Sequence, residues 1–258
     1  MRGLPMIDAY THLDMGVDDP LAALEQRMDG AAVDRAFIVE TWNKDNRRCL
    51  YQLAASHSSR FRVAFCFRPE DEPFSPAMFE RETVGGMRVR TADLRTFSPY
   101  TAELTRSGKW LIPHSEAGIG VLADELLWLA EACPELRIYL PHMGWPKRDK
   151  REDQDWDKSM SALSALPHLV AGVSAIAHFS QEAFPHLDIR RAAMRLREIF
   201  APGRLCAGSD YPLFDTTRYA DYMKLADEWI GRSVEELSIL ESALFENLPR
   251  ATRAPGEP

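Results

Sequence analysis

Residues 110–140 read WLIPHSEAGIGVLADELLWLAEACPELRIYL, a strand, a helix and a second strand in direct succession. Trp110–Pro113 (WLIP) and Arg137–Leu140 (RIYL) are short apolar runs typical of buried strands. Between them, Val121–Ala132 carries apolar residues at three- and four-residue spacing with charges between, which is the period of a helix. This order predicts a βαβ unit with parallel strands and a right-handed crossover.

The same alternation extends in both directions from this unit. Further strands are predicted at Pro5–Ala9, Arg35–Glu40, Phe61–Phe67, Val84–Arg90, Leu169–Val173 and Arg204–Ala207. Further helices are predicted at Asp19–Asp29, Lys44–His57, Ile189–Phe200, Arg218–Ile230 and Val234–Glu246. The strand at Val84–Arg90 has the weakest signal, because its paired glycines lower strand propensity. Eight strand–helix units predict an α/β fold, a single (β/α)₈ TIM barrel over residues 1–258, with a flexible tail at Ala251–Pro258.

The competing fold is an open, doubly wound parallel sheet. That fold usually carries a glycine-rich phosphate-binding turn after its first strand, and the sequence has none there. The length of 258 residues is also usual for one barrel, which typically needs about 250. The barrel is therefore the preferred prediction.

Composition narrows the class of partner. The net charge of -8, from 31 basic and 39 acidic residues, argues against a nucleic acid, which binds a clustered basic face. No apolar run approaches the roughly 20 residues that span a bilayer, and the first strand begins too early to leave room for a signal peptide. The four cysteines lack zinc-ribbon or redox spacing. We expect a cytoplasmic protein that acts on a small molecule, without nucleic-acid or membrane partners, and the sequence leaves a homo-oligomer open.

Polar side chains gather at the predicted carboxyl ends of the strands, where barrel enzymes have their active sites. They are Asp8, Tyr10 and His12 after the first strand, His114 after the fifth, His142 after the sixth and Asp210 after the eighth. Backbone alternation is expected to place Asp8, Tyr10 and His12 on one side. A single histidine at a strand end is more often a hydrogen-bonded structural residue. Three of them with an aspartate at one barrel mouth instead predict metal ligands or general acid–base groups, and His178 is an outlying candidate.

A second group of residues predicts how a substrate is held. Arg68 follows the third strand, and Arg88 and Arg90 share one face of the fourth. Guanidinium groups pair with carboxylates through two parallel hydrogen bonds, so these arginines favour an anionic substrate. Trp42, just beyond the second strand, is expected either to pack on a cyclic substrate or to cap the barrel. Surface or supporting salt bridges are the alternative role for each arginine.

Four motifs carry a family resemblance: IDAYTH (residues 7–12), IPHSEAG (112–118), LPHMGWP (140–146) and GSDYP (208–212), with a weaker echo in FENLPRAT (245–252). With them the chain resembles the amidohydrolase-related superfamily, in the branch of pyrone dicarboxylate lactonase, aminocarboxymuconate semialdehyde decarboxylase and the resorcylate decarboxylases. The motifs run from the first strand to the last helix. The resemblance implies His12, His114 and Asp210 as metal ligands and His142 as a catalytic acid, base or carbonyl-polarising group.

The chain departs from that pattern at Tyr10, where the family usually has a histidine or an acidic residue. A phenol with an unperturbed pKa of about 10 is neutral at pH 7 and is a poor metal ligand. Three protein ligands still make a catalytic zinc site, whereas the lactonase branch that the chain resembles works without metal. One divalent metal (Zn or Mn) and no metal are therefore both open.

Three functions follow from these residues. The first is hydrolysis of a small, carboxylated cyclic ester, amide or acyl substrate, in which Asp210 activates water and His142 or a metal polarises the carbonyl, with Tyr10 as a further hydrogen-bond donor. The second is metal-dependent, non-oxidative decarboxylation of an aromatic or unsaturated acid. The third is a non-catalytic barrel that binds small acids.

Overall fold

The chain forms a nearly closed barrel of eight parallel strands in the order β1 to β8 in a computed structural model. The structure describes residues 6–42, 46–55, 59–70, 75–115, 118–146, 150–231, 233, 235–236 and 243–245. The strands are β1 (Met6–Thr11), β2 (Val33–Val39), β3 (Phe61–Cys66), β4 (Val84–Arg90), β5 (Trp110–His114), β6 (Arg137–Leu140), β7 (Leu169–Val173) and β8 (Leu205–Ala207). The predicted (β/α)₈ barrel is confirmed.

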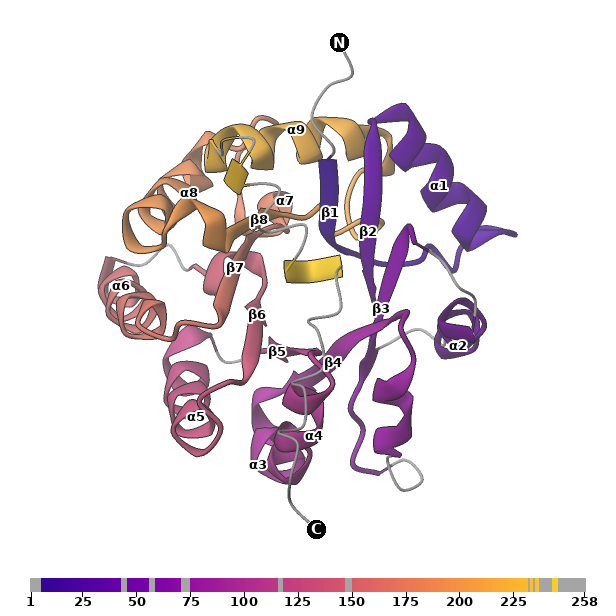
Figure 1. The fold of residues 1–258 in the computed structure, drawn as a ribbon. Coiled ribbons are helices and arrows are strands. Elements are labelled where there is room, and N and C mark those ends of the chain that lie inside the picture. The colour runs from indigo at the N-terminus through magenta and orange to yellow at the C-terminus, as the bar shows by residue number, and fades with distance from the viewer. Residues whose placement is uncertain are drawn as a thin grey trace.

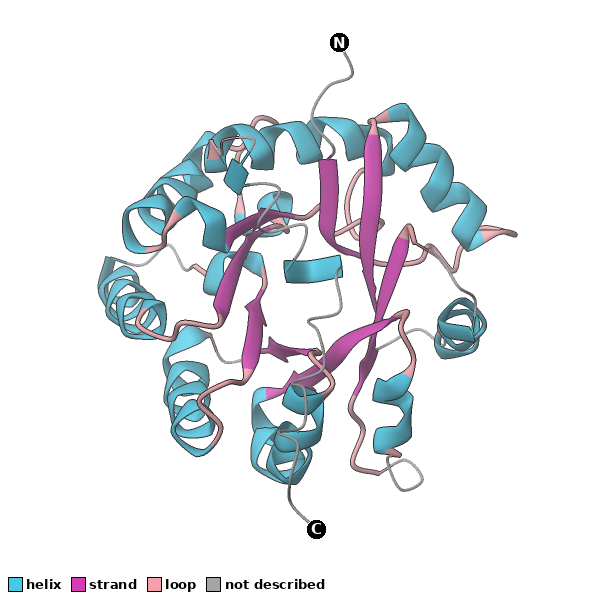
Figure 2. Ribbon diagram, viewed as in Figure 1, coloured by secondary structure: helices cyan, strands magenta, loops and turns pink. Residues whose placement is uncertain are grey.

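Helices alternate with the strands and form a ring around them (Figures 1 and 2). They are α1 (Pro20–Gly30), α2 (Arg47–Ala55), α3 (Leu94–Phe97), α4 (Thr101–Arg106), α5 (Ile119–Ala132), α6 (Lys150–Ser164), α7 (Ile176–Phe179), α8 (Leu187–Ile199) and α9 (Tyr219–Ile230). Residues 235–236 and 243–245 are also helical. The rest of the predicted helix at Val234–Glu246, Pro5 of the first predicted strand, the predicted helix ends at 44–45 and 56–57, and the predicted tail lie outside the described residues.

Strand β4 has the predicted bounds despite its two glycines, and the reason is steric. A Cβ atom on Gly86 would collide with the backbone oxygen of Trp110 on β5, and one on Gly85 would lie 2.7 Å from the ring of Phe37. The glycines therefore mark a close approach of neighbouring chain rather than a weak strand. They also fix the path of the strand that carries Arg88 and Arg90.

The apolar core has two layers, as expected for a barrel inside a ring of helices. The larger cluster lies between strands and helices, and the smaller one fills the barrel. The barrel filling includes the buried side chains of Ile7, Phe37, Val39, Ala64, Trp110, Ile112, Tyr139, Cys206 and Phe245. Because this filling is dense, the barrel is a packed support for its mouth and not a pore.

The short helical segment at residues 243–245 closes one end of the barrel and is drawn in yellow across its axis in Figure 1. Arg62, near the start of β3, donates to the backbone oxygen of Phe245 at 2.6 Å, and Arg137, at the start of β6, donates to that of Ala243. The guanidinium of Arg35 on β2 lies 5.5 Å from the Phe245 ring centre. These contacts involve the amino ends of the strands, so the opposite, carboxyl end is the one left for a substrate.

The first and last strands meet through backbone hydrogen bonds that also bring site residues together. The amide of Asp210 donates to the oxygen of Tyr10 at 2.9 Å, and the amide of His12 donates to the oxygen of Tyr211 at 2.7 Å. A Cβ atom on Gly208 would lie 2.9 Å from that of Tyr10, so this crossing needs a glycine. Closing the barrel thus places Tyr10 and His12 against Asp210.

Candidate active site at the carboxyl ends of the strands

Strand β1 does not alternate as the sequence predicts. Its register with β2 is irregular between Asp8 and Thr11, as at a β-bulge. Asp8 points to the helix layer, where its carboxylate accepts from the Ser209 hydroxyl at 2.6 Å and the Tyr219 hydroxyl on α9 at 2.9 Å. Burial raises the pKa of Asp8 to about 6 despite these bonds. The expectation that Asp8 lies on the same side as Tyr10 and His12 is therefore wrong, and its role is to join β1 to β8 and α9.

His12 and Asp210 form a buried pair of ionisable groups in the site. The Nε2 atom of His12 lies 3.4 Å from Oδ1 of Asp210, and both side chains are buried. The Nδ1–H of His12 donates to the backbone oxygen of Val39 at 2.5 Å, which fixes the orientation of the ring. Asp210 has a left-handed backbone with φ of 59°, a strained conformation for a non-glycine residue.

Tyr10 lies fully buried among the site's aromatic rings. Its ring centre is 4.6 Å from that of His142 and 5.2 Å from that of His12, in edge-to-face geometry. Burial raises the pKa of its phenol well above the usual 10, although Arg88 opposes the shift. Tyr10 is therefore a neutral hydrogen-bond donor at physiological pH and not an anionic ligand.

His142 is held on a strained turn directly after β6. His142, Met143, Gly144 and Trp145 all have positive φ, and non-glycine residues adopt that conformation at a cost. Ser174, just after β7, accepts from the backbone amide of His142 at 3.0 Å and lies 3.0 Å from Nδ1 of its ring. Burial lowers the pKa of His142 to about 4, against the opposing effect of Asp210. The imidazole is neutral at pH 7 and its orientation is fixed.

His114 contacts Arg88 directly. Nη2 of Arg88 lies 3.1 Å from Nδ1 of His114. A guanidinium can only donate, so Nδ1 must accept, and the proton of the neutral ring is on Nε2. Burial and the Arg88 charge lower the pKa of His114 to about 3, which keeps it neutral. His114 therefore presents an N–H donor to its surroundings.

The predicted substrate-binding residues come together around the ring of Trp42. The guanidinium carbons of Arg90, Arg88 and Arg68 lie 4.3, 5.5 and 6.0 Å from its ring centre. The Trp42 ring is also 6.0 Å from that of His114. Trp42 thus links the arginine group to the catalytic candidates.

A buried carboxylate that the sequence analysis did not single out organises these arginines. Glu40 accepts from Arg68 at 2.8 Å, from Nε of Arg47 at 2.9 Å and from the Cys66 amide at 2.7 Å, and its backbone oxygen accepts from Arg88 at 2.8 Å. Its side chain is 0% exposed. Glu40 follows β2 and Ser174 follows β7, so a census of every strand end would have found both.

Several buried polar atoms of this mouth have no hydrogen-bond partner within the described part of the chain. They are the Tyr10 hydroxyl, Oδ1 of Asp210, Nε1 of Trp42 and Nε of Arg88 and of Arg90. Folded proteins pair nearly all buried polar atoms, because an unpaired one costs roughly 1–3 kcal/mol. Five such atoms at one end of one barrel indicate a binding site for a polar molecule.

The charges of the site follow from its surroundings. Although burial raises the pKa of Asp210, the nearby His142, His12 and Arg88 outweigh it and hold that pKa below the usual 3.8. At pH 7 the site therefore contains a carboxylate, a neutral His114, a neutral His142 and a neutral phenol. One acceptor facing several donors suits a reaction in which water loses a proton and a carbonyl oxygen gains charge.

A divalent metal fits this donor set poorly. His12 has the usual pattern of a ligand, with one nitrogen donating to a carbonyl oxygen and the other free to bind. In His114 the second nitrogen instead meets the Arg88 donor, so Nε2 has a proton and no lone pair. Tyr10 is neutral as well. Among the described residues no group of three His, Cys, Asp or Glu side chains is arranged to hold an ion, and a catalytic zinc needs three protein ligands. The set of His12, His114 and Asp210 stays a prediction, and we derive no step through a metal.

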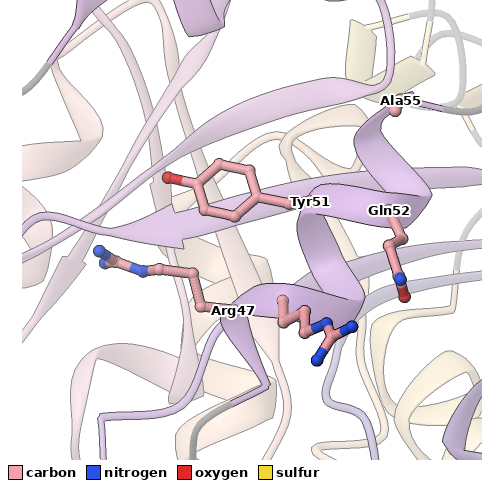
Figure 3. A pocket seen from close by; sticks show the side chains of 5 residues that line it. Arg47, Tyr51, Gln52 and Ala55 are labelled. Atoms are coloured by element: carbon pink, nitrogen blue, oxygen red, sulfur yellow. The ribbon is translucent and has the colours of Figure 1, made fainter.

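A separate hollow lies on the outside of helix α2 and is lined by Arg47, Arg48, Tyr51, Gln52 and Ala55 (Figure 3). Tyr51 covers Phe65 with its ring centres 4.7 Å apart. The lining contains no histidine, carboxylate or thiol, and the guanidinium of Arg47 is bound to Glu40. The chemistry of the protein is therefore assigned to the barrel mouth.

The remaining described histidines lie elsewhere. His178 on α7 is exposed and packs beside Phe179 and Phe214. His168 pairs with Glu135 at 3.2 Å, and His186 stacks on Tyr222. These contacts give His168 and His186 a structural role. The charge of His178 contributes to the lowered pKa of His142, and its place among the site candidates stays a prediction.

A family model described as amidohydrolase matches residues 119–239. The sequence resemblance to the amidohydrolase-related superfamily is thereby confirmed. No curated protein matches the chain significantly. Within the described residues, no helix has both the length and the apolar character that crossing a bilayer would require.

Solved structures share the whole barrel. A candidate 2-pyrone-4,6-dicarboxylic acid hydrolase from Pseudomonas putida is 21% identical, with a TM-score of 0.74 over 95% of this chain and 98% of the other. A zinc-bound amidohydrolase from Burkholderia multivorans is 19% identical, with a TM-score of 0.73 over 95% and 100%. A 2,6-dihydroxybenzoate decarboxylase from Rhizobium is 12% identical, with a TM-score of 0.60 over 95% and 99%. At these identities the likeness establishes the fold and leaves the reaction open.

Proposed function

We propose that this amidohydrolase-like barrel is a hydrolase of a small, carboxylated cyclic ester and that it works without a bound metal. The observation that carries the proposal is the pairing of two unsatisfied groups in one buried mouth. Oδ1 of Asp210 is an acceptor and the Tyr10 hydroxyl is a donor, and neither has a partner among the described residues. Hydrolysis needs one group of each kind.

Asp210 acts as the general base in this proposal. Its carboxylate accepts a proton from water while the water oxygen attacks the carbonyl carbon. Nε2 of His12 lies 3.4 Å from Oδ1 of this carboxylate. When the tetrahedral intermediate collapses, the bond between the carbonyl carbon and the ring oxygen breaks, and Asp210 returns the proton to the departing oxygen.

The developing oxyanion is stabilised by neutral donors. The Tyr10 hydroxyl and the Nε2–H of His114 donate hydrogen bonds to the oxyanion. The imidazole of His142, which Ser174 holds in place, polarises the carbonyl. Such donors are preorganised because their orientations are set by protein contacts and not by solvent. Their neutrality matters, since a neutral donor leaves the Asp210 carboxylate able to accept a proton.

The substrate carboxylate is assigned to the arginines around Trp42. Arg68, Arg88 and Arg90 supply positive charge, and the ring of Trp42 offers a flat apolar surface to a planar substrate. The Pseudomonas putida structure is named for a hydrolase of a pyrone, a cyclic ester with two carboxylates, and this supports the substrate class proposed for this chain.

Incorporation of ¹⁸O from water and release of carbon dioxide distinguish hydrolysis from decarboxylation. We expect the purified protein, incubated with cyclic esters of planar carboxylic acids in ¹⁸O-water, to place one ¹⁸O in the new carboxylate and to release no carbon dioxide. Asp210→Asn should lower kcat by roughly 10²- to 10⁴-fold with an unchanged circular dichroism spectrum. Asp215→Asn is the matched control, because Asp215 is an exposed carboxylate of the same loop that caps a turn through Thr217.

Three results would contradict the proposal. Carbon dioxide release from an aromatic acid without ¹⁸O incorporation would assign the site to decarboxylation. Retention of full hydrolytic activity by Asp210→Asn would remove Asp210 as the base. Tight binding of planar acids with no turnover of either substrate class would make the barrel a binding protein.

A further inference from the structure

Arg88 occupies an unusual place for a cation, against a histidine that the family resemblance marks as a metal ligand. It is 5% exposed, yet it forms no ion pair with a carboxylate side chain in the described residues. Its guanidinium donates to the backbone oxygen of Glu40 at 2.8 Å and to Nδ1 of His114 at 3.1 Å. Its guanidinium also lies 5.9 Å from the ring centre of Tyr10. A buried charge placed against a histidine nitrogen needs a functional reason.

The two histidines that the family resemblance marks as metal ligands have opposite second contacts. Nδ1 of His12 donates to the Val39 oxygen, so Nε2 has a free lone pair directed at Asp210. Nδ1 of His114 accepts from Arg88, so Nε2 of His114 is protonated. Metal-binding histidines almost always have the first arrangement, with the second nitrogen donating to an acceptor. Turning His114 into a ligand would require its proton to move to Nδ1, where it would point at an N–H of Arg88.

We infer that Arg88 is a positioning residue that keeps the site free of divalent metal. It does so by locking His114 as an Nε2–H donor and by placing a positive charge beside the position that an ion would occupy. The same bond turns a residue that the family resemblance marks as a ligand into an oxyanion donor. The inference rests on the metal-free chemistry proposed above and does not depend on the identity of the substrate.

Charge repulsion adds to the effect of the hydrogen bond. An ion ligated by Nε2 of His114 would lie one imidazole ring away from the guanidinium. At such a separation two positive groups in a protein interior repel strongly enough to weaken binding by roughly 100-fold or more. Removing the charge and the donor together should therefore let His12, His114 and Asp210, which the described structure does not hold in ligating positions, close around an ion.

Zinc titration by calorimetry tests this inference, with Arg88→Met as the main variant. The protein is treated with chelator while folded and is not refolded afterwards. Methionine matches the length of the apolar stem but neither donates nor carries charge. We expect wild type to show no zinc binding at this site in the titration and Arg88→Met to bind one ion per chain. The zinc affinity of Arg88→Met should exceed any affinity of wild type by at least roughly 100-fold. Arg88→Lys keeps a cationic donor and should stay zinc-free. Arg90→Met removes a neighbouring cation that contacts Trp42 and should also stay zinc-free.

Two further readouts identify the ligands and keep the inference testable if Arg88→Met fails to fold. Adding Asp210→Asn to Arg88→Met should abolish the new binding, and cobalt in place of zinc should give the visible spectrum of a tetrahedral site. In unaltered protein, ¹⁵N NMR of the histidine side chains should report His114 as the Nε2–H tautomer and His12 protonated at Nδ1. A His114 protonated at Nδ1 would overturn the inference without any variant.

The outcomes separate this inference from the proposed function. Stoichiometric zinc in wild type, removed by Asp210→Asn, would overturn both. A metal-free wild type together with a metal-free Arg88→Met would overturn the role of Arg88 and leave metal-free hydrolysis standing. Zinc binding by Arg88→Lys as tight as that by Arg88→Met would likewise exclude the donor-and-charge explanation.

Discussion

At the scale of single residues, the site depends on groups that are buried without a protein partner. Tyr10 is the clearest case, because its ring is packed by His12, Tyr139 and His142 while its hydroxyl is unpaired in the described structure. Packing and chemistry are thus carried by different parts of one side chain. A variant can remove one without the other.

Tyr10→Phe makes this separation measurable. Since no described residue bonds the hydroxyl, we expect the free energy of unfolding to change by less than about 1 kcal/mol. The loss of an oxyanion donor should lower kcat by roughly 10²- to 10³-fold. Urea denaturation and steady-state kinetics on one preparation check both halves. Full activity in the phenylalanine variant would leave the hydroxyl without a catalytic role.

The ionisation of the site predicts an unusual pH profile. Burial lowers the pKa of His142 to about 4 and that of His114 to about 3, and the pKa of Asp210 is also held low. All three are therefore in their working states over a wide range. We expect kcat/KM to be flat between about pH 5 and 8 and to fall below about pH 4, as His142 becomes charged. A fall centred near pH 6.5 would mean that an ordinary histidine controls the reaction.

At the scale of elements, the ends of β2, β3 and β4 together form the anion-binding half of the mouth. Glu40 at the end of β2 holds Arg68 after β3 and, through its backbone, Arg88 on β4. Arg47 of α2 also binds the same carboxylate. Because one anion orients several cations, its removal should disturb substrate binding more than the chemical step.

Glu40→Gln tests that division of labour. We expect KM for a carboxylated substrate to rise by roughly 10- to 100-fold with kcat within about threefold, because uniform binding is lost. Stability should fall by about 3 kcal/mol or more, since a buried ion pair is broken. Glu25→Gln is the control, because Glu25 meets Arg60 at 3.9 Å on the surface with 41% of its side chain exposed. A fall in kcat at unchanged KM would instead connect Glu40 to catalysis.

The elements were predictable where a strand is uniformly apolar. Leu169–Val173 has the predicted bounds, because burial on both faces leaves a continuous run of apolar residues. Arg137–Leu140 and Val84–Arg90 also have the predicted bounds, although both contain arginine and the second contains two glycines. The side on which Asp8 lies could not be predicted, since a β-bulge breaks the alternation on which the prediction depends. The bond between Arg88 on β4 and His114 on β5 was also out of reach. That bond depends on the register of the two strands. The tautomer of His114, which argues against a metal, depends in turn on that bond.

At the scale of the whole molecule, the two ends of the barrel have separate functions. The carboxyl ends of the strands contain the unpaired polar groups, and the amino ends are covered by residues 243–245. Phe245 is 3% exposed and belongs to the core inside the barrel. The support beneath the site therefore depends on a segment that is distant from the site in sequence.

Phe245→Ala should destabilise the protein by about 3 kcal/mol or more, because it leaves a cavity under the barrel. Activity at low temperature should stay within a few-fold, as Phe245 meets Arg35 and Arg62 near the amino ends of the strands, away from the mouth. Chemical denaturation and kinetics below the melting transition measure the two effects. Leu187→Ala, at a leucine that is 56% exposed, is the control and should change stability little. An unaltered free energy of unfolding for Phe245→Ala would show that the segment does not support the barrel.

The backbone bonds between Tyr10 and Asp210 and between His12 and Tyr211 have a consequence for how the site comes into being. Asp210 follows the last strand of the sheet and His12 follows the first, so the two side chains come together only when the barrel closes. Any local opening that separates the first strand from the last should also abolish the proposed activity. Amide hydrogen exchange at Asp210 and His12 would then measure how often this contact opens. Loss of activity would accompany loss of the closed barrel.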